Sequence, residues 1–324
     1  MNRFDYLLQK CRATRQALRC IPVALTMLLL QAAVLNAARI PIIDAHSQAE
    51  HELKLDKVIT LMDKAGVTRT ILAARRKTKP EDLLAFAARH PERITPALRT
   101  KSGHYSANRP KYYKFLAKQM KLEGFAAIAE VLMYHAEKIN KRGKSMAPEV
   151  RVLPEDRRVQ AALEIALRKG WPFVIHIEFA SAGGDRAVFM EQMETMLRAH
   201  PTHPFALIHM GQLEAEEVGR LIEAHPNLHF LTAHATPFSI AKSREPWANM
   251  FEGKRLAPPW KALILRHPER FVMAFDNVWA KHWGKLYLKQ VALWRKALGD
   301  LPPEVAHALA HRNAERLWKL PPAQ

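Results

Sequence analysis

Beyond residue 40, the sequence alternates between short runs of β-branched and apolar residues and longer segments with apolar residues at helical spacing. This alternation is typical of a parallel sheet whose strands are connected by crossover helices. The short runs predict eight strands, at residues 40–44, 68–73, 93–98, 124–132, 172–177, 204–209, 228–233 and 270–275. Eight units in this order predict an α/β fold, a single (β/α)8 TIM barrel, with a doubly wound open sheet as the alternative.

The segments between the predicted strands carry helix start and stop signals. The segment 154–168 begins with Pro154 and is followed by Gly170, and the segment 54–65 is followed by Gly66. Further helices are expected within residues 80–90, 110–122, 185–200, 214–225, 259–266, 286–298 and 303–318. The chain has 324 residues, 48% of them hydrophobic, which is enough for one large core of this kind.

The N-terminal segment, residues 1–38, has a different character. Basic residues between positions 3 and 19 precede an apolar run over 20–38, whose length is close to the roughly 20 residues that span a bilayer. This pattern predicts a signal peptide or an uncleaved inner-membrane anchor, followed by a periplasmic barrel domain at residues 39–324. Both cysteines, Cys11 and Cys20, lie in the N-terminal segment, so the barrel has no thiol, which suits an oxidising compartment.

The formal net charge of +19 favours anionic partners: nucleic acid, anionic lipid or acidic small substrates. A solvated basic surface explains it equally well, because the basic residues are spread along the chain. The barrel lacks a basic stripe interleaved with aromatic residues, so we expect a small-molecule substrate rather than nucleic acid. The densest basic cluster, at positions 138, 141, 142 and 144, surrounds a glycine and predicts an exposed loop.

Polar residues gather at the carboxyl ends of the predicted strands, the face on which barrel enzymes carry their active sites. These residues are Asp44 and His46 after strand one, Glu130 late in strand four, His176 ending strand five, His209 ending strand six and Asp276 ending strand eight. The three histidines together with the carboxylates of Glu130 and Asp276 at one face predict a divalent-metal site. Zn²⁺ is the ion expected first, with Mn²⁺ and Mg²⁺ as alternatives.

Each of these residues also has a structural explanation. Asp44 could cap the next helix, and Glu130 could pair with a lysine or arginine of the barrel. His135, after strand four, and His234, after strand seven, are candidates for substrate contact or support of the site, as are Asp44 and Gln48. The joint placement at separate strand ends favours a shared site over isolated structural roles.

The order of these residues resembles that in the amidohydrolase superfamily. The sequence segments around them are most similar to those of its amidohydrolase-related hydrolases and decarboxylases. The similar segments are Pro41-Ile-Ile-Asp-Ala-His46, Phe173-Val-Ile-His176, Leu207-Ile-His209-Met-Gly211, Phe275-Asp276-Asn277 and Asn313-Ala-Glu-Arg-Leu317. The resemblance covers the chain from about residue 40 to its end. It implies that His46, His176 and Asp276 are metal-associated, that Asp276 also accepts a proton, and that His209 is a ligand or a catalytic histidine.

Gln48 departs from the family pattern, which has a second histidine two residues after His46. An amide is a weaker ligand for Zn²⁺ than an imidazole. Glu130 resembles the ligating position of related branches, including TatD-like nucleases, and could compensate. The metal ligands expected are thus His46, Glu130, His176 and Asp276.

Two functions follow from this pattern. The first is a metal-dependent hydrolase of a small carbonyl substrate, such as an amide, lactone or ester. The basic net charge favours a substrate that carries an anionic group. Decarboxylation of an acid is the alternative reaction. The second is a catalytically impaired TIM-barrel binding protein of the cell envelope, because Gln48 replaces the usual histidine. Metal analysis of the barrel separates them.

Overall fold

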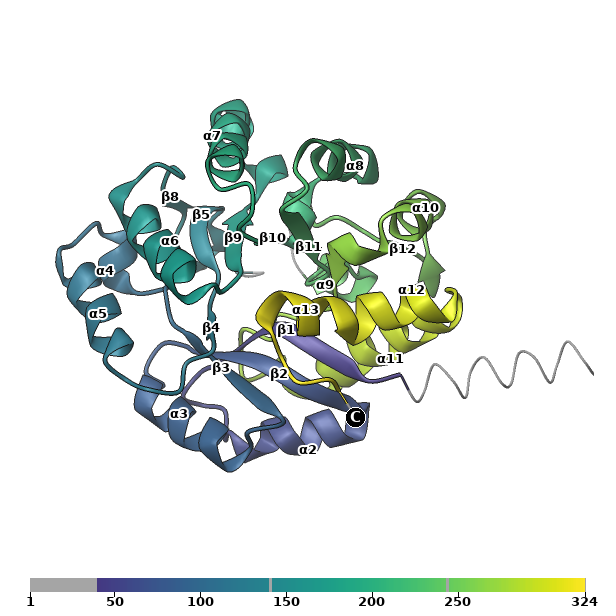
Figure 1. The fold of residues 1–324 in the computed structure, drawn as a ribbon, viewed down its shortest axis with the longest axis horizontal. Coiled ribbons are helices and arrows are strands. Elements are labelled where there is room, and N and C mark those ends of the chain that lie inside the picture. The colour runs from purple at the N-terminus through teal and green to yellow at the C-terminus, as the bar shows by residue number, and fades with distance from the viewer. Residues whose placement is uncertain (1–39, 140–141, 243–244, 324) are drawn as a thin grey trace, which may run out of the picture.

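The computed structural model describes residues 40–139, 142–242 and 245–323, and in this part the parallel strands form a barrel (Figure 1). The strands pair in the order β1-β2-β3-β4 on one side and β14-β11-β10-β9-β5 on the other. Their bounds are β1 Ile42–Ala49, β2 Val67–Ala74, β3 Ile94–Leu98, β4 Ala127–Ile128, β5 Val131–His135, β9 Phe173–Ile177, β10 Phe205–Ile208, β11 Leu228–Leu231 and β14 Phe271–Val272. The TIM-barrel prediction is confirmed.

Strands β4 and β5 are two pieces of the predicted fourth strand, interrupted at Ala129 and Glu130. The barrel closes where the chain after β14 runs beside β1. There the Ala45 N–H donates to the Met273 carbonyl over 2.9 Å, and the Asp276 N–H donates to the His46 carbonyl over 2.8 Å. The first and last strands are therefore joined at the level of the predicted site.

Helices surround the strands, and most begin and end within a few residues of the predicted bounds (Figure 1). They are α2 Asp56–Ala65, α3 Pro80–Arg89, α5 Lys111–Met120, α6 Arg157–Lys169, α7 Arg186–Ala199, α8 Ala215–Ala224, α10 Pro258–Arg266 and α11 Lys285–Gly299. Two short helices, α4 Gly103–Ser106 and α9 Pro237–Lys242, follow β3 and β11. The chain is helical throughout the predicted last helix, 303–318, but a π-helical turn, Ala308–Arg312, lies between α12 Pro303–His307 and α13 Asn313–Trp318.

Short antiparallel hairpins extend the connections. β6 (Lys138–Ile139) pairs with β7 (Ser145–Ala147), β8 (Val150–Arg151) pairs with β5, and β12 (Phe251–Glu252) pairs with β13 (Arg255–Leu256). The loop predicted around position 142 is thus a hairpin. Lys138 at its base is not an exposed loop residue, because it forms ion pairs with Glu178 and Glu245.

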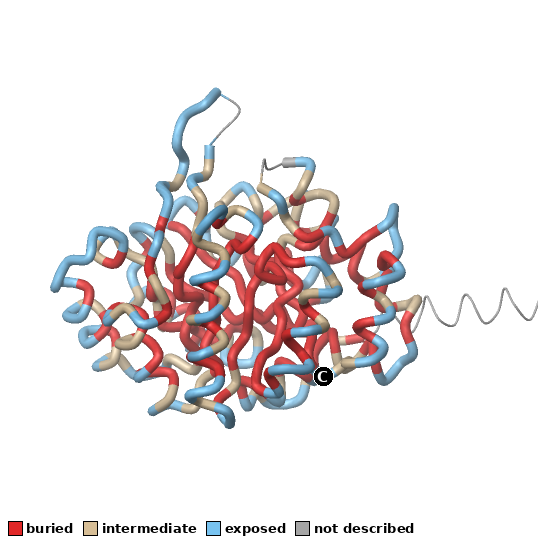
Figure 2. Tube along the Cα trace, turned by 90° about the horizontal axis from the view of Figure 1, so that it is seen from above, coloured by how far each residue is buried: buried red, intermediate tan, exposed pale blue. Residues whose placement is uncertain are grey.

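The buried hydrophobic residues form two clusters, one between strands and helices and one inside the barrel. Figure 2 shows the buried residues concentrated in the middle of the fold and the exposed ones around its edge. The inner group is rich in alanine, with Ala45, Ala73, Ala97, Ala129 and Ala206 among its members. Small side chains inside the barrel leave the space near the strand ends to the larger polar residues.

The predictions for residues 1–38 lie outside the described residues. Within the part of the chain that the structure describes, we find no helix long and apolar enough to cross a membrane.

Candidate metal centre

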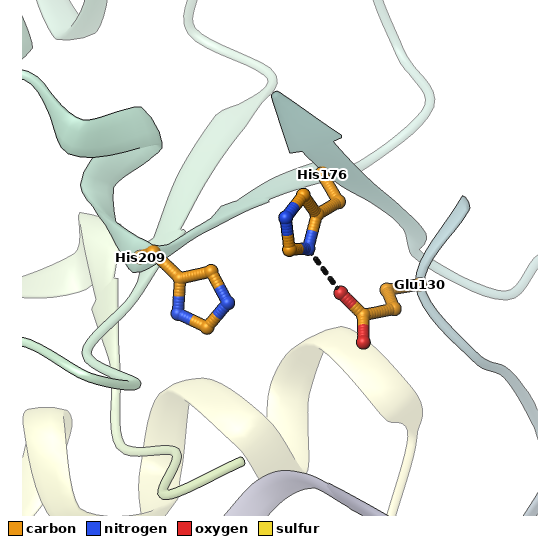
Figure 3. Close-up of side chains that lie close together, drawn as sticks. All are labelled: Glu130, His176 and His209. Atoms are coloured by element: carbon orange, nitrogen blue, oxygen red, sulfur yellow. Dashed lines mark hydrogen bonds and ion pairs between the residues drawn. The ribbon is translucent and has the colours of Figure 1, made fainter. Parts of the chain in front are cut away.

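Five side chains predicted from strand ends lie together at the carboxyl end of the barrel, all of them buried: His46, Glu130, His176, His209 and Asp276. The donor atoms of Glu130, His176 and His209 lie within 4.8 Å of one another (Figure 3), and so do those of His46, Glu130 and Asp276. The expected convergence of these residues is therefore what the geometry shows.

A β-bulge sets the directions of the side chains along β1. Its register against β2 advances by three residues between Asp44 and Ser47 while β2 advances by two. Ile43 and Ala45 face the barrel interior by strand alternation, and the shift in register lets the next two alternate residues, His46 and Gln48, contact Glu130.

Asp44 lies beside the centre rather than in it. Its carboxylate accepts hydrogen bonds from the N–H groups of Phe275 and His46, at 3.0 and 3.3 Å, and from the Ser47 hydroxyl at 2.6 Å. Burial raises the pKa of Asp44 to about 7, although these hydrogen bonds lower it. The sequence makes Asp44 a candidate for substrate contact or for support of the site. Its hydrogen bonds join the first strand to the chain after the last strand, so they favour a supporting role.

Glu130 is fully buried, and both oxygens of its carboxylate contact other side chains of the centre. Its Oε1 accepts from Gln48 Nε2 at 2.8 Å and from the Lys101 ammonium, and lies 3.2 Å from His46 Nε2. Its Oε2 lies 2.5 Å from His176 Nδ1. Burial alone would raise the pKa of Glu130, but Lys101 and the two histidines outweigh it and hold the pKa well below its usual range. The pairing with a barrel lysine therefore exists alongside the contacts to the site.

His176 lies between two carboxylates. Its Nε2 is 3.0 Å from Glu178 Oε1, and Glu178 is in turn held by the Ala136 N–H at 2.8 Å and by Lys138 Nζ at 2.6 Å. Burial would raise the pKa of Glu178, but His176 and Lys138 lower it to about 2. Such a carboxylate behind a histidine fixes the ring and its tautomer. Burial lowers the pKa of His135, whose ring lies 5.3 Å from that of His176, to about 3.

His209, His234 and Asp276 share an unusual backbone feature: their φ angles are +59°, +58° and +46°. Positive φ is uncommon outside glycine and clusters at functional sites. His209 donates from Nδ1 to the Ala233 carbonyl at 3.0 Å, so its Nε2 presents a lone pair, 3.5 Å from Asp276 Oδ2. The His234 ring stacks on His209 with centroids 4.5 Å apart, and Trp247 covers both rings.

Gly211 makes the left-handed turn after β10 possible. At its φ of +63°, an added Cβ would lie 2.8 Å from Leu207 Cδ2 and 3.0 Å from Phe179 Cδ2. The turn that aims His209 at the centre therefore requires glycine at this position.

We expect Gly211→Ala to lower the free energy of unfolding by about 2–4 kcal/mol, the sum of left-handed strain and overpacking. Denaturant unfolding measures this loss. Gly219→Ala within helix α8 is the matched control, because its Cβ meets only Leu263 Cδ1 at 3.4 Å and alanine favours the helix. Equal stability of the two variants would contradict the role given to Gly211.

Basic and aromatic side chains lie in the connections next to the centre. The Arg75 guanidinium, after β2, lies 4.0 Å from the Trp279 ring centroid and 3.4 Å from Glu50. Lys138 Nζ lies 5.0 Å from the Trp247 ring centroid. Sequence reasoning missed Lys101, Arg75 and Trp247, since each stands in a connection with no motif around it.

The residues of the centre fit a divalent metal ion. Imidazole nitrogens and carboxylate oxygens are the donors that Zn²⁺ takes in hydrolases. His209 offers a lone pair from Nε2, since its Nδ1 donates to a backbone carbonyl, and the Glu130 carboxylate is held as an anion. Buried histidines and carboxylates at the carboxyl ends of a parallel barrel define a metal-dependent hydrolase.

The chain belongs to the amidohydrolase family, whose model matches residues 43–320. This confirms the resemblance predicted from the sequence and identifies the protein as an enzyme. No curated protein matches the chain.

Solved structures share the fold at low sequence identity. An uncharacterised TIM-barrel protein from Bordetella bronchiseptica is 16% identical with a TM-score of 0.54, over 86% of this chain and 99% of that one. A 4-oxalomesaconate hydratase from Rhodopseudomonas palustris is 14% identical with a TM-score of 0.53, over 86% and 95%. A probable 2-pyrone-4,6-dicarboxylic acid hydrolase from Acinetobacter baumannii, with citric acid bound, is 10% identical with a TM-score of 0.52, over 86% and 99%.

Proposed function

We propose that this enzyme hydrolyses a small carboxylate-bearing ester, lactone or amide with the help of one or more divalent ions, Zn²⁺ first among them. The observation that carries the proposal is the buried cluster of histidines and carboxylates around Glu130 and Asp276. Burying ionisable groups lowers the stability of the folded protein, and clusters of them are found mainly at sites of binding or catalysis. The ligands predicted from the sequence, His46, Glu130, His176 and Asp276, stay a prediction.

Each residue has a task in the proposed hydrolysis. The metal would supply a Lewis acid and lower the pKa of a bound water. Asp276 accepts the proton of the attacking water, since its Oδ2 faces the two imidazoles of His209 and His234 at 3.5 and 3.7 Å. His209 keeps its orientation through the Ala233 carbonyl, and its Nε2 lone pair would help to hold the metal ion, which would supply the positive charge that steadies the oxygen that gains charge.

An anionic substrate suits the basic side chains beside the centre. Arg75, Lys101 and Lys138 carry side chains that are 15, 23 and 21% exposed, so they are partly desolvated yet reachable. Partly desolvated charges attract ligands of opposite sign more strongly than fully solvated charges on an open surface. The likeness in fold to a protein named for a pyrone dicarboxylic acid points the same way.

The alternative of a catalytically impaired binding protein of the cell envelope gains no support, because the chain matches a family of enzymes. Export, a periplasmic location and membrane anchoring through residues 20–38 remain proposals from the N-terminal pattern.

The test is a panel of matched esters and lactones with and without a second carboxylate. We expect activity to disappear after chelation, to return with Zn²⁺ or Mn²⁺, and to favour the carboxylate-bearing compounds by about tenfold or more in kcat/KM, the effect of one charge contact. Arg75→Met should remove most of this preference, whereas Arg89→Met on helix α3 should keep it. Full activity in thoroughly chelated protein would overturn the metal-dependent hydrolase.

A further inference from the structure

The centre has two halves that share Glu130. One half surrounds its Oε1 and contains His46, Gln48 and Asp276; the other surrounds its Oε2 and contains His176 and His209 (Figure 3). Either half has enough donor atoms to be considered for an ion, so their contacts decide between them.

The Oε1 half is filled by positive and N–H groups of the chain itself. Gln48 Nε2 donates to Glu130 Oε1 at 2.8 Å and to Asp276 Oδ1 at 3.0 Å, so it bridges the two carboxylates. The Lys101 ammonium lies against the same Glu130 oxygen. An ion in this half would have to displace the amide and lie beside the positive charge of Lys101, which repels it.

The Oε2 half holds neither an ammonium nor an amide. Its Glu130 oxygen faces only His176 Nδ1, at 2.5 Å, a contact that an ion bound to both atoms would replace. His176 is backed by Glu178, and His209 by the Ala233 carbonyl, so each ring turns one nitrogen toward the space between them. Their planes are at 83°, with centroids 5.0 Å apart, an arrangement in which both in-plane lone pairs can reach one ion.

Two further groups could be considered. In the group of His135, His176 and Glu178, the Lys138 ammonium already lies 2.6 Å from Glu178 Oε2. The group of His209, His234 and Asp276 is excluded by ring geometry. The two rings are stacked at 3°, and an ion must lie close to the plane of each imidazole that binds it. Two parallel stacked planes have no common point, so these rings cannot share an ion without turning.

We propose that Lys101 and Gln48 take the place of a second metal ion, and that one divalent ion binds in the Oε2 half to Glu130, His176 and His209. This inference rests on the proposed metal-dependent hydrolysis and specifies its centre. Asp276 is then held by Gln48 rather than by an ion, which leaves it available as the proton acceptor.

The test is titration of the metal-free full chain with Co²⁺, followed by absorption of the bound ion and by elemental analysis. We expect one ion per chain in the wild type and two in the double variant Gln48→His, Lys101→Met, a twofold rise. Lys118→Met, which removes an ammonium paired with Glu81 on the outer wall, should keep one ion. His209→Asn should lose the first ion, whereas Asp276→Asn should retain it.

Three results would overturn the inference: two ions in the wild type, a double variant that still binds one, or loss of the ion in Asp276→Asn with retention in His209→Asn. In each of these cases metal-dependent hydrolysis stands, and only the location is wrong. A wild type that binds no ion and still hydrolyses its substrate would reject the proposed function as well.

Discussion

Glu130→Gln is expected to abolish hydrolysis and to weaken metal binding by about a thousandfold. One oxygen of its carboxylate accepts hydrogen bonds from Lys101 and Gln48, and the other contacts His176. The carboxylate is fully buried. Glutamine replaces one acceptor with an N–H donor that faces another donor, and it removes the charge that balances Lys101. Breaking a buried charge pair costs about 3–5 kcal/mol, and about 4 kcal/mol corresponds to a thousandfold in binding.

Three measurements on this variant belong together: metal content, kcat/KM and thermal unfolding. Glu194→Gln on the outer helix α7 is the matched control, because that carboxylate is paired with Arg220 and His225 away from the centre. It should keep metal and activity. Normal metal content in a folded Glu130→Gln protein would remove Glu130 from the centre.

Asp276→Asn is expected to lower kcat by about two to four powers of ten, the usual contribution of a positioned base. Asparagine is a suitable replacement because it tolerates the left-handed φ of +46° and still accepts from Gln48. The measured loss then reports the missing proton acceptor rather than a changed backbone.

Metal content completes this experiment. The variant should keep its metal ion, since its kcat falls because the proton acceptor is missing. Asp185→Asn, at the start of helix α7, is the control and should retain the wild-type kcat and metal content. An unchanged kcat for Asp276→Asn would assign the proton transfer to another residue.

The ends of the strands could be predicted from the sequence, because a short hydrophobic run is followed there directly by His, Glu or Asp. That reasoning found His46, Glu130, His176, His209 and Asp276, which the structure brings together. It also identified Gln48 as the departure from the family, and Gln48 does contact both carboxylates.

The remaining features depend on contacts between distant segments. Lys101 stands in a connection after β3, and nothing in its neighbours shows that it pairs with Glu130, 29 residues away. The stacking of His234 on His209 follows from two left-handed backbone turns, of which only Gly211 gives a sequence signal. The π-helical turn at Ala308–Arg312 is invisible because the apolar spacing around it suits an ordinary helix.

The seam between the first and last strands also makes activity depend on segments that lie far apart in the chain. The Asn277 amide donates to the Ser47 hydroxyl across 230 residues, and the Asp276 N–H donates to the His46 carbonyl. A chain that stops before residue 270 contains Glu130, His176 and His209, but not the acid that accepts the proton. Such a fragment is therefore expected to be inactive even where its remaining strands pair.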